Sequence, residues 1–111
     1  MNDIKLMNKA ADNIRILAAS MVEKAKSGHP GGAMGGADFV NVLFSEFLVY
    51  DPKNPAWEGR DRYFQDPGHM SPMLYSVLAL AGKFTIDELK EFRQWGSVTP
   101  GHPEVNVMRG I

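Results

Sequence analysis

The chain has 111 residues, with 12 Lys and Arg against 13 Asp and Glu and a formal net charge of −1. This balance provides no basic surface for nucleic acid or for a membrane, and the length allows one small domain or a part of one. The sequence has no cysteine, no secretory-type apolar run at its start and no segment able to span a bilayer, so we expect a cytoplasmic protein.

An amphipathic helix is predicted near the N-terminus, from about residue 3 to residue 26. Asp3 suits its N-cap, and Gly28 suits its end. Apolar residues recur at alternating steps of three and four, which places on one face Ile4, Met7, Ala11, Ile14, Ala18, Met21 and Ala25. A glycine-rich turn is predicted over residues 28–36, and it lacks the Gly-Lys-Ser/Thr ending of a P-loop.

A second helix is predicted over residues 39–49. Because its apolar residues point in nearly every direction, we expect neighbours on most sides and a place at the centre of a core: Phe39, Val40, Val42, Leu43, Phe44, Phe47, Leu48 and Val49. The helix is expected to end at Asp51, since a residue before proline is disfavoured in the α conformation.

Arg62 to Gln65 form the only predicted strand of the chain. A single strand would leave backbone donors and acceptors unpaired on both edges, so its partner strands are expected elsewhere. Together with the apolar second helix, this indicates an incomplete α/β fold, of which the chain supplies the mostly helical N-terminal part.

A third helix is predicted to begin with Ser71 as N-cap and Pro72 at the first helical position, and to end at Gly82. Its apolar residues share one face: Leu74, Val77, Leu78 and Ala81.

Thr85 and Glu88 predict a capping box for a fourth helix, which carries Leu89, Phe92 and Trp95. Residues 96–111 show no periodicity and are expected to form a loop. The four helices together predict about 60 % helix.

Each of the three histidines follows a glycine, at His29, His69 and His102. Glycine and proline around them predict rigid loops, and imidazole is well suited to move protons near neutral pH. A purely structural role as an N-cap or surface residue stays open for each one. Their spacing matches no usual zinc-ligand pattern, so we expect no metal site in this chain.

Six segments of the chain resemble the N-terminus of the transketolase family of thiamine diphosphate enzymes, over residues 10–104. The matching residues are Lys24-Ala25-Lys26-Ser27-Gly28-His29-Pro30-Gly31, Asp51-Pro52-x-Asn54-Pro55-x-Trp57, Arg60-Asp61-Arg62-Tyr63-Phe64, Gly68-His69-x-Ser71-x-x-Leu74-Tyr75-Ser76, Glu88-Leu89-Lys90-x-Phe92-Arg93-Gln94 and Thr99-Pro100-Gly101-His102-Pro103-Glu104.

The resemblance implies transfer of a two-carbon ketol unit from a ketose phosphate to an aldose phosphate in the pentose phosphate pathway, with thiamine diphosphate as cofactor. It implies catalytic and substrate-binding roles for His29, at the reacting carbonyl, and for His102, at the C1 hydroxyl of the donor. It places His69 near the diphosphate of the cofactor.

The resemblance also implies that residues 1–111 are the N-terminal portion of a diphosphate-binding domain with a parallel sheet, in a homodimeric enzyme. In the family, the ligands of the Mg²⁺ or Ca²⁺ ion, the glutamate that activates the cofactor and the phosphate-binding basic residues lie outside this segment. We therefore expect the isolated chain to be inactive, since catalysis needs the whole preorganised site.

The sequence departs from the family pattern around His69, where Asp66-Pro67 precede and Met70 follows, and it carries extra glycine over residues 31–36. The shape of the loop around His69 is therefore open. Two other functions also stay open: a self-standing helical binding module that docks a partner on the apolar second helix, and a sister enzyme such as dihydroxyacetone synthase.

Overall fold

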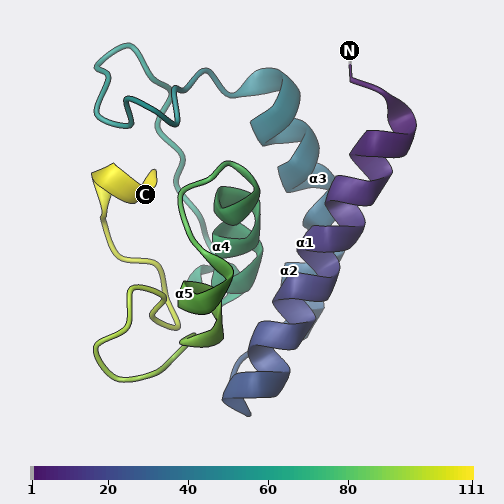
Figure 1. Ribbon diagram of the computed structural model, residues 1–111, viewed down its shortest axis with the longest axis vertical. Helices are drawn as coiled ribbons and strands as arrows, with labels where there is room; N and C mark the ends of the chain where they lie inside the picture. Colours follow the sequence, from purple (N-terminus) through teal and green to yellow (C-terminus); the bar gives the residue numbers. More distant parts are fainter. Residues whose placement is uncertain (1) are drawn as a thin grey trace.

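The computed structural model describes residues 2–111, and more than half of these residues are helical (Figure 1). The α-helices are α1 (Ile4–Ala25), α2 (Pro30–Gly35), α3 (Ala37–Val42), α4 (Ser71–Leu80) and α5 (Ile86–Lys90). Shorter turns are the π-helical η1 (Leu43–Phe47) and the 3-10 helices η2 (Gly68–Met70) and η3 (Val107–Arg109). No helix of the described residues is long and apolar enough to cross a membrane.

Helix α1 confirms the predicted amphipathic helix. The Asp3 carboxylate accepts hydrogen bonds from the backbone N–H groups of Lys5 and Leu6, at 2.7 and 3.1 Å, and so caps the first turn. Lys26 caps the C-terminal end of the helix in the left-handed conformation, which agrees with the predicted range of residues 3–26, although the cap is Lys26 and not Gly28. The buried face packs on α2, α3 and α4 and consists of Ala11, Ile14, Ala18 and Met21.

The prediction of a glycine-rich turn was wrong, because residues 30–35 form helix α2. Pro30 begins this helix at a position where proline is favourable. A Cβ atom at Gly32 would lie 2.9 Å from Cγ of Met70, and one at Gly36 would lie 2.6 Å from Sδ of Met73. Close packing against these two methionines therefore requires the glycines, and tertiary contact overrides their poor helix propensity.

The second predicted helix is present, but its expected place at the centre of the core is wrong. It consists of α3 followed by the π-helical turn η1, and it ends at Leu48. Val40 and Phe44 are buried, whereas Phe39 is 66 % and Phe47 is 69 % exposed. The segment thus packs on α1 and α4 with one side and presents apolar side chains on the other.

Helix α4 occupies the centre of the core (Figure 1). All residues from Ser71 to Leu78 are buried, so the predicted single apolar face is too narrow a description. Ser71 was predicted as the N-cap, but this was wrong, because Met70 holds that position. The core cluster around α4 includes Ile14, Ala18, Met21, Val40, Phe44, Leu74, Tyr75, Leu78, Phe84, Leu89 and Phe92.

The predicted strand at residues 62–65 is absent, and residues 2–111 contain no strand. A strand is defined by its ladder of hydrogen bonds, and no neighbouring segment of the described chain provides one. Tyr63 instead packs edge-on against Phe44, with ring centroids 5.3 Å apart.

Helix α5 confirms the predicted capping box. Thr85 Oγ1 accepts from the N–H of Glu88 at 3.1 Å, and the Glu88 carboxylate accepts from the N–H of Thr85 at 2.9 Å. The prediction that Trp95 continues the apolar face of this helix was wrong. The chain turns after Lys90 and leaves the Trp95 side chain fully exposed.

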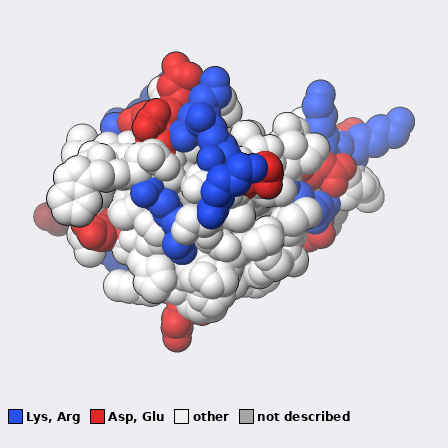
Figure 2. Space-filling view, turned by 90° about the horizontal axis from the view of Figure 1, so that it is seen from below, with Lys and Arg blue, Asp and Glu red and all other residues white. Residues whose placement is uncertain are grey.

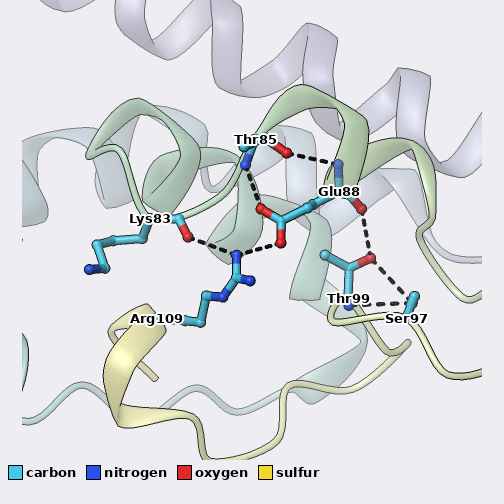
Figure 3. A network of polar contacts seen from close by, with 6 residues as sticks. All are labelled: Lys83, Thr85, Glu88, Ser97, Thr99 and Arg109. Atoms are coloured by element: carbon cyan, nitrogen blue, oxygen red, sulfur yellow. Dashed lines mark hydrogen bonds and ion pairs between the residues drawn. The ribbon is translucent and has the colours of Figure 1, made fainter.

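The C-terminal segment, mostly loop as predicted, is tied to α5 by a polar network (Figure 3). The other carboxylate oxygen of Glu88 pairs with Arg109 at 2.6 Å, and Arg109 also donates to the carbonyl oxygen of Lys83 at 3.2 Å. Thr99 Oγ1 donates to the carbonyl oxygen of Glu88 at 3.1 Å. The Arg109 guanidinium lowers the pKa of Glu88, and Glu88 in turn raises the pKa of Arg109.

Candidate functional site

The fold brings the three Gly–His pairs together at the N-terminal end of α4. The ring centroids of His29 and His69 are 4.7 Å apart, with their planes tilted by 59°. The His102 ring lies against the backbone of Gly68, since a Cβ atom there would be only 3.1 Å from Nδ1 of His102. Three histidines from separate parts of the sequence therefore meet around the turn Gly68–His69.

His29 is exposed and immediately precedes α2. It occupies the N-cap position of that helix, but its side chain makes no capping hydrogen bond. Gly28 before it has φ +124°, a conformation that favours glycine. The turn thus projects an imidazole that has no capping role in the local structure.

His69 is half-buried and lies within the 3-10 turn η2, so the predicted loop position was wrong for this histidine. The turn leads directly into α4, and Met70 next to His69 packs against Gly32 of α2. His69 is therefore held at the N-terminal end of the most buried helix, next to the more exposed ring of His29.

His102 is exposed on a loop that side chains of α4 hold in place. Ser71 Oγ donates to the carbonyl oxygen of Gly101, and the Tyr75 hydroxyl donates to the carbonyl oxygen of Pro100, both at 2.6 Å. Burial raises the pKa of Tyr75, and the charge of Glu104 raises it further, so the hydroxyl remains a donor. These two bonds fix the backbone on the N-terminal side of His102.

Sequence reasoning did not identify Ser71, Tyr75 or Arg93 as parts of this site. Arg93 donates to Ser27 near His29 and passes over Gly101 next to His102. All three lie inside segments that resemble transketolase, which is the signal in the sequence that points to them.

None of the hydrogen bonds within residues 2–111 uses a histidine side chain. In the same described part, no group of three or more His, Asp or Glu side chains is placed to hold a metal ion. Imidazole N–H groups donate hydrogen bonds to oxygen atoms, and this is the chemistry that the residue type brings to the cluster. Figure 2 shows a short band of adjoining basic side chains in the upper middle of the face in view, with acidic side chains beside it.

Comparison with known proteins matches residues 6–111 to the family described as transketolase, thiamine diphosphate binding domain. A transketolase of Buchnera aphidicola is 51 % identical over 107 residues, which cover 96 % of this chain and 16 % of the relative. The crystal structure of transketolase from Campylobacter jejuni superposes with a TM-score of 0.89 at 46 % identity, over 99 % of this chain and 17 % of that one.

A transketolase from Pichia stipitis, solved in complex with sedoheptulose-7-phosphate, matches 88 % of this chain and 14 % of its own with a TM-score of 0.85 and 44 % identity. The chain thus spans about a sixth of the length of the relatives it matches. The expected fold class is confirmed: these residues match the mostly helical N-terminal part of a thiamine diphosphate-binding domain.

Proposed function

The chain belongs to the family of the transketolase thiamine diphosphate-binding domain, and on this premise we propose that it supplies the histidine cluster of a ketol-transfer site. The intact enzyme moves a two-carbon ketol unit from a ketose phosphate to an aldose phosphate. The convergence of His29, His69 and His102 at one end of α4 carries this proposal. A sugar phosphate substrate is supported by the relative that was solved with sedoheptulose-7-phosphate.

The different exposure of the three histidines supports a separate role for each. His29 and His102 are exposed and would face the sugar, while His69 is half-buried next to His29 and would face the cofactor. When bound, thiamine diphosphate supplies the nucleophilic carbon that the amino acids lack. His29 would donate a hydrogen bond to the carbonyl oxygen of the ketose phosphate and transfer the proton of that oxygen. His102 would bind the C1 hydroxyl of the same sugar.

The residues present fit a diphosphate. Imidazole N–H groups are donors that a phosphate oxygen accepts, and no hydrogen bond within residues 2–111 already occupies the three rings. Gly68 also leaves the backbone beside His69 uncovered except by the His102 ring. His69 would therefore hold the diphosphate of the cofactor.

The proposal includes what the family resemblance implies about the whole protein. Residues 1–111 would be the N-terminal portion of its diphosphate-binding domain, and a second subunit would complete a homodimer. The Mg²⁺ or Ca²⁺ ligands would lie outside residues 1–111, and the enzyme would serve the pentose phosphate pathway in the cytoplasm. The matched relatives described above are transketolases, so a self-standing binding module and a dihydroxyacetone synthase gain no support.

The test replaces His29 and His69 separately by alanine in the full-length enzyme that carries this segment. His29→Ala is expected to lower kcat/KM by about a hundredfold to ten-thousandfold, because a positioned acid-base group is lost, with the affinity for thiamine diphosphate unchanged. His69→Ala is expected to weaken cofactor binding by roughly 1.5 to 3 kcal/mol, the value of one charge-assisted hydrogen bond. Calorimetric titration with thiamine diphosphate, beside steady-state kinetics, separates the two, and equal cofactor affinity in both variants would contradict this division of labour.

A further inference from the structure

Arg93 has a backbone conformation that non-glycine residues rarely adopt. Its φ is +62°, in the left-handed region, at the point where the chain leaves the end of α5. Its backbone N–H donates to the carbonyl oxygen of Thr99 at 3.1 Å, which closes the loop between them. Such a conformation is strained for a residue with a side chain and persists only where surrounding contacts impose it.

The side chain of Arg93 lies between the loops that carry His29 and His102. Nη1 donates to Ser27 Oγ at 3.1 Å, two residues before His29. A Cβ atom at Gly101 would lie 2.9 Å from Nε and 3.1 Å from Cζ of Arg93, and one at Gly28 would lie 3.6 Å from Nε. One guanidinium thus touches the residue before His29 and the residue before His102.

The guanidinium is also partly desolvated. Nε is buried and has no hydrogen-bond partner within the described chain, and Cζ lies 5.5 Å from the ring centroid of Phe92. An arginine with a choice of rotamers would turn this N–H toward water, because an unpaired buried donor destabilises the fold. The close approach to two glycines holds it in place instead.

We propose that Arg93 is a positioning residue that sets the separation of the His29 and His102 loops, so that both imidazoles reach one ligand. This inference rests on the proposed function for its kinetic consequence. The flat guanidinium fills the narrow space between the Gly28 and Gly101 backbones while it bonds to Ser27. Lysine has a rounded ammonium on a flexible stem and cannot do both.

The first test is independent of activity and uses ¹³C-histidine NMR spectra of the chain. Arg93→Ala is expected to move the imidazole resonances of both His29 and His102. Ser27→Ala, which removes the bond on one side only, is expected to move His29 and leave His102 in place. Lys90→Ala removes a nearby exposed cation that pairs with Asp87 at 3.6 Å, and serves as the matched control.

The second test uses the full-length enzyme. Arg93→Ala is expected to lower kcat/KM by about tenfold to a hundredfold, the cost of misplacing a catalytic group by about 1 Å, with unchanged affinity for thiamine diphosphate. Arg93→Lys keeps the charge and is expected to recover only part of this loss. If Arg93→Ala does not fold, Arg93→Lys takes its place in both tests, with smaller shifts of the same two imidazoles.

Two results would overturn the inference: imidazole resonances of His29 and His102 that move no more in the Arg93 variants than in Lys90→Ala, or wild-type kinetics in Arg93→Lys. Absence of ketol transfer in the wild-type enzyme would contradict the proposed function instead, and the NMR comparison would still decide the role of Arg93.

Discussion

Helix α4 and the α3–η1 segment have similarly apolar sequences but opposite surroundings. Every residue of α4 from Ser71 to Leu78 is buried, and the helix contacts α1, α2, α3 and α5. Along α3–η1, Val40 and Phe44 are buried, while Phe39 and Phe47 are exposed. The two regions lie side by side in the fold, with α4 in the middle and α3–η1 beside α1 (Figure 1).

This difference shows that an all-round apolar helix predicts contact with protein on most sides but does not say which segments provide that contact. For residues 71–78 of α4 the described residues provide all of it. For α3–η1 they cover only one side. Large exposed aromatic side chains on one segment are typical of a surface that another piece of protein covers, and we expect the two regions to respond differently to the same kind of substitution.

The sharpest test of this contrast is a pair of large-to-small substitutions. Leu74→Ala in α4 is expected to destabilise the chain by about 2 to 5 kcal/mol, because it leaves a cavity at a side chain that is 2 % exposed. Phe39→Ala in α3 is expected to cost under about 0.5 kcal/mol, as for other exposed positions. Urea denaturation of both variants measures this, and equal losses would show that the α3 face is covered in solution.

A second pair of variants tests the contact that joins α2 to α4. Gly36→Ala is expected to cost about 1 to 3 kcal/mol, because the new methyl group would meet Sδ of the buried Met73. Gly35→Ala is the matched control, since nothing lies within 4 Å of its Cβ position. It is expected to stabilise the helix by roughly 0.5 to 1 kcal/mol. Thermal unfolding compares the two, and a destabilised Gly35→Ala would mean that α2 does not pack as described.

These contacts explain which parts of the fold could be predicted from the sequence. Helix α1 and the capping box of α5 depend on nearby residues, and both predictions were confirmed. Helix α2 could not be predicted, because the close packing of Gly32 against Met70 joins residues far apart in the sequence. The strand at residues 62–65 was wrong because a strand needs a partner, and its residues alone cannot supply one.

The site shows the same limit. Its histidines were predicted from their glycine neighbours and from the resemblance to transketolase, but the convergence at Gly68 depends on how α4 holds three distant segments. Likewise, the pattern that suggested Ser71 as an N-cap could not reveal that its hydroxyl bonds to Gly101 instead. Residue type indicated the chemistry, and only tertiary contacts showed which groups meet.

Substitutions in the polar network around Glu88, which lies outside α4 and α3–η1, are expected to change stability less than Leu74→Ala does. Thr85→Ala is expected to cost about 1 kcal/mol through the lost cap. Glu88→Gln keeps a capping-box side chain and loses only the ion pair with Arg109, for under about 1 kcal/mol near neutral pH.

The pH dependence of this difference has a definite sign. Arg109 lowers the pKa of Glu88 in the folded chain below its ordinary value of 4.5, so the ion pair stabilises the fold above that pH and is lost as the pH falls through the lowered pKa. Urea titrations from pH 7 to pH 3 should therefore show wild type and Glu88→Gln converging toward acid. A constant gap would mean that Arg109 does not pair with Glu88 in solution.

The smallest effect on stability, and the most direct test of the uncovered face, comes from Phe47→Ser. The exposed aromatic rings of α3–η1 are expected to drive self-association of the isolated chain at high concentration, since water disfavours contiguous apolar surface. The substitution should raise the monomer fraction seen by light scattering and change the free energy of unfolding by under about 0.5 kcal/mol. Trp95→Ser removes an even more exposed ring from a loop outside the segment and should leave association unchanged. A wild-type chain that stays monomeric at high concentration would contradict self-association through the α3–η1 face. Its aromatic side chains would then need a partner of more specific shape than a second copy of the same surface.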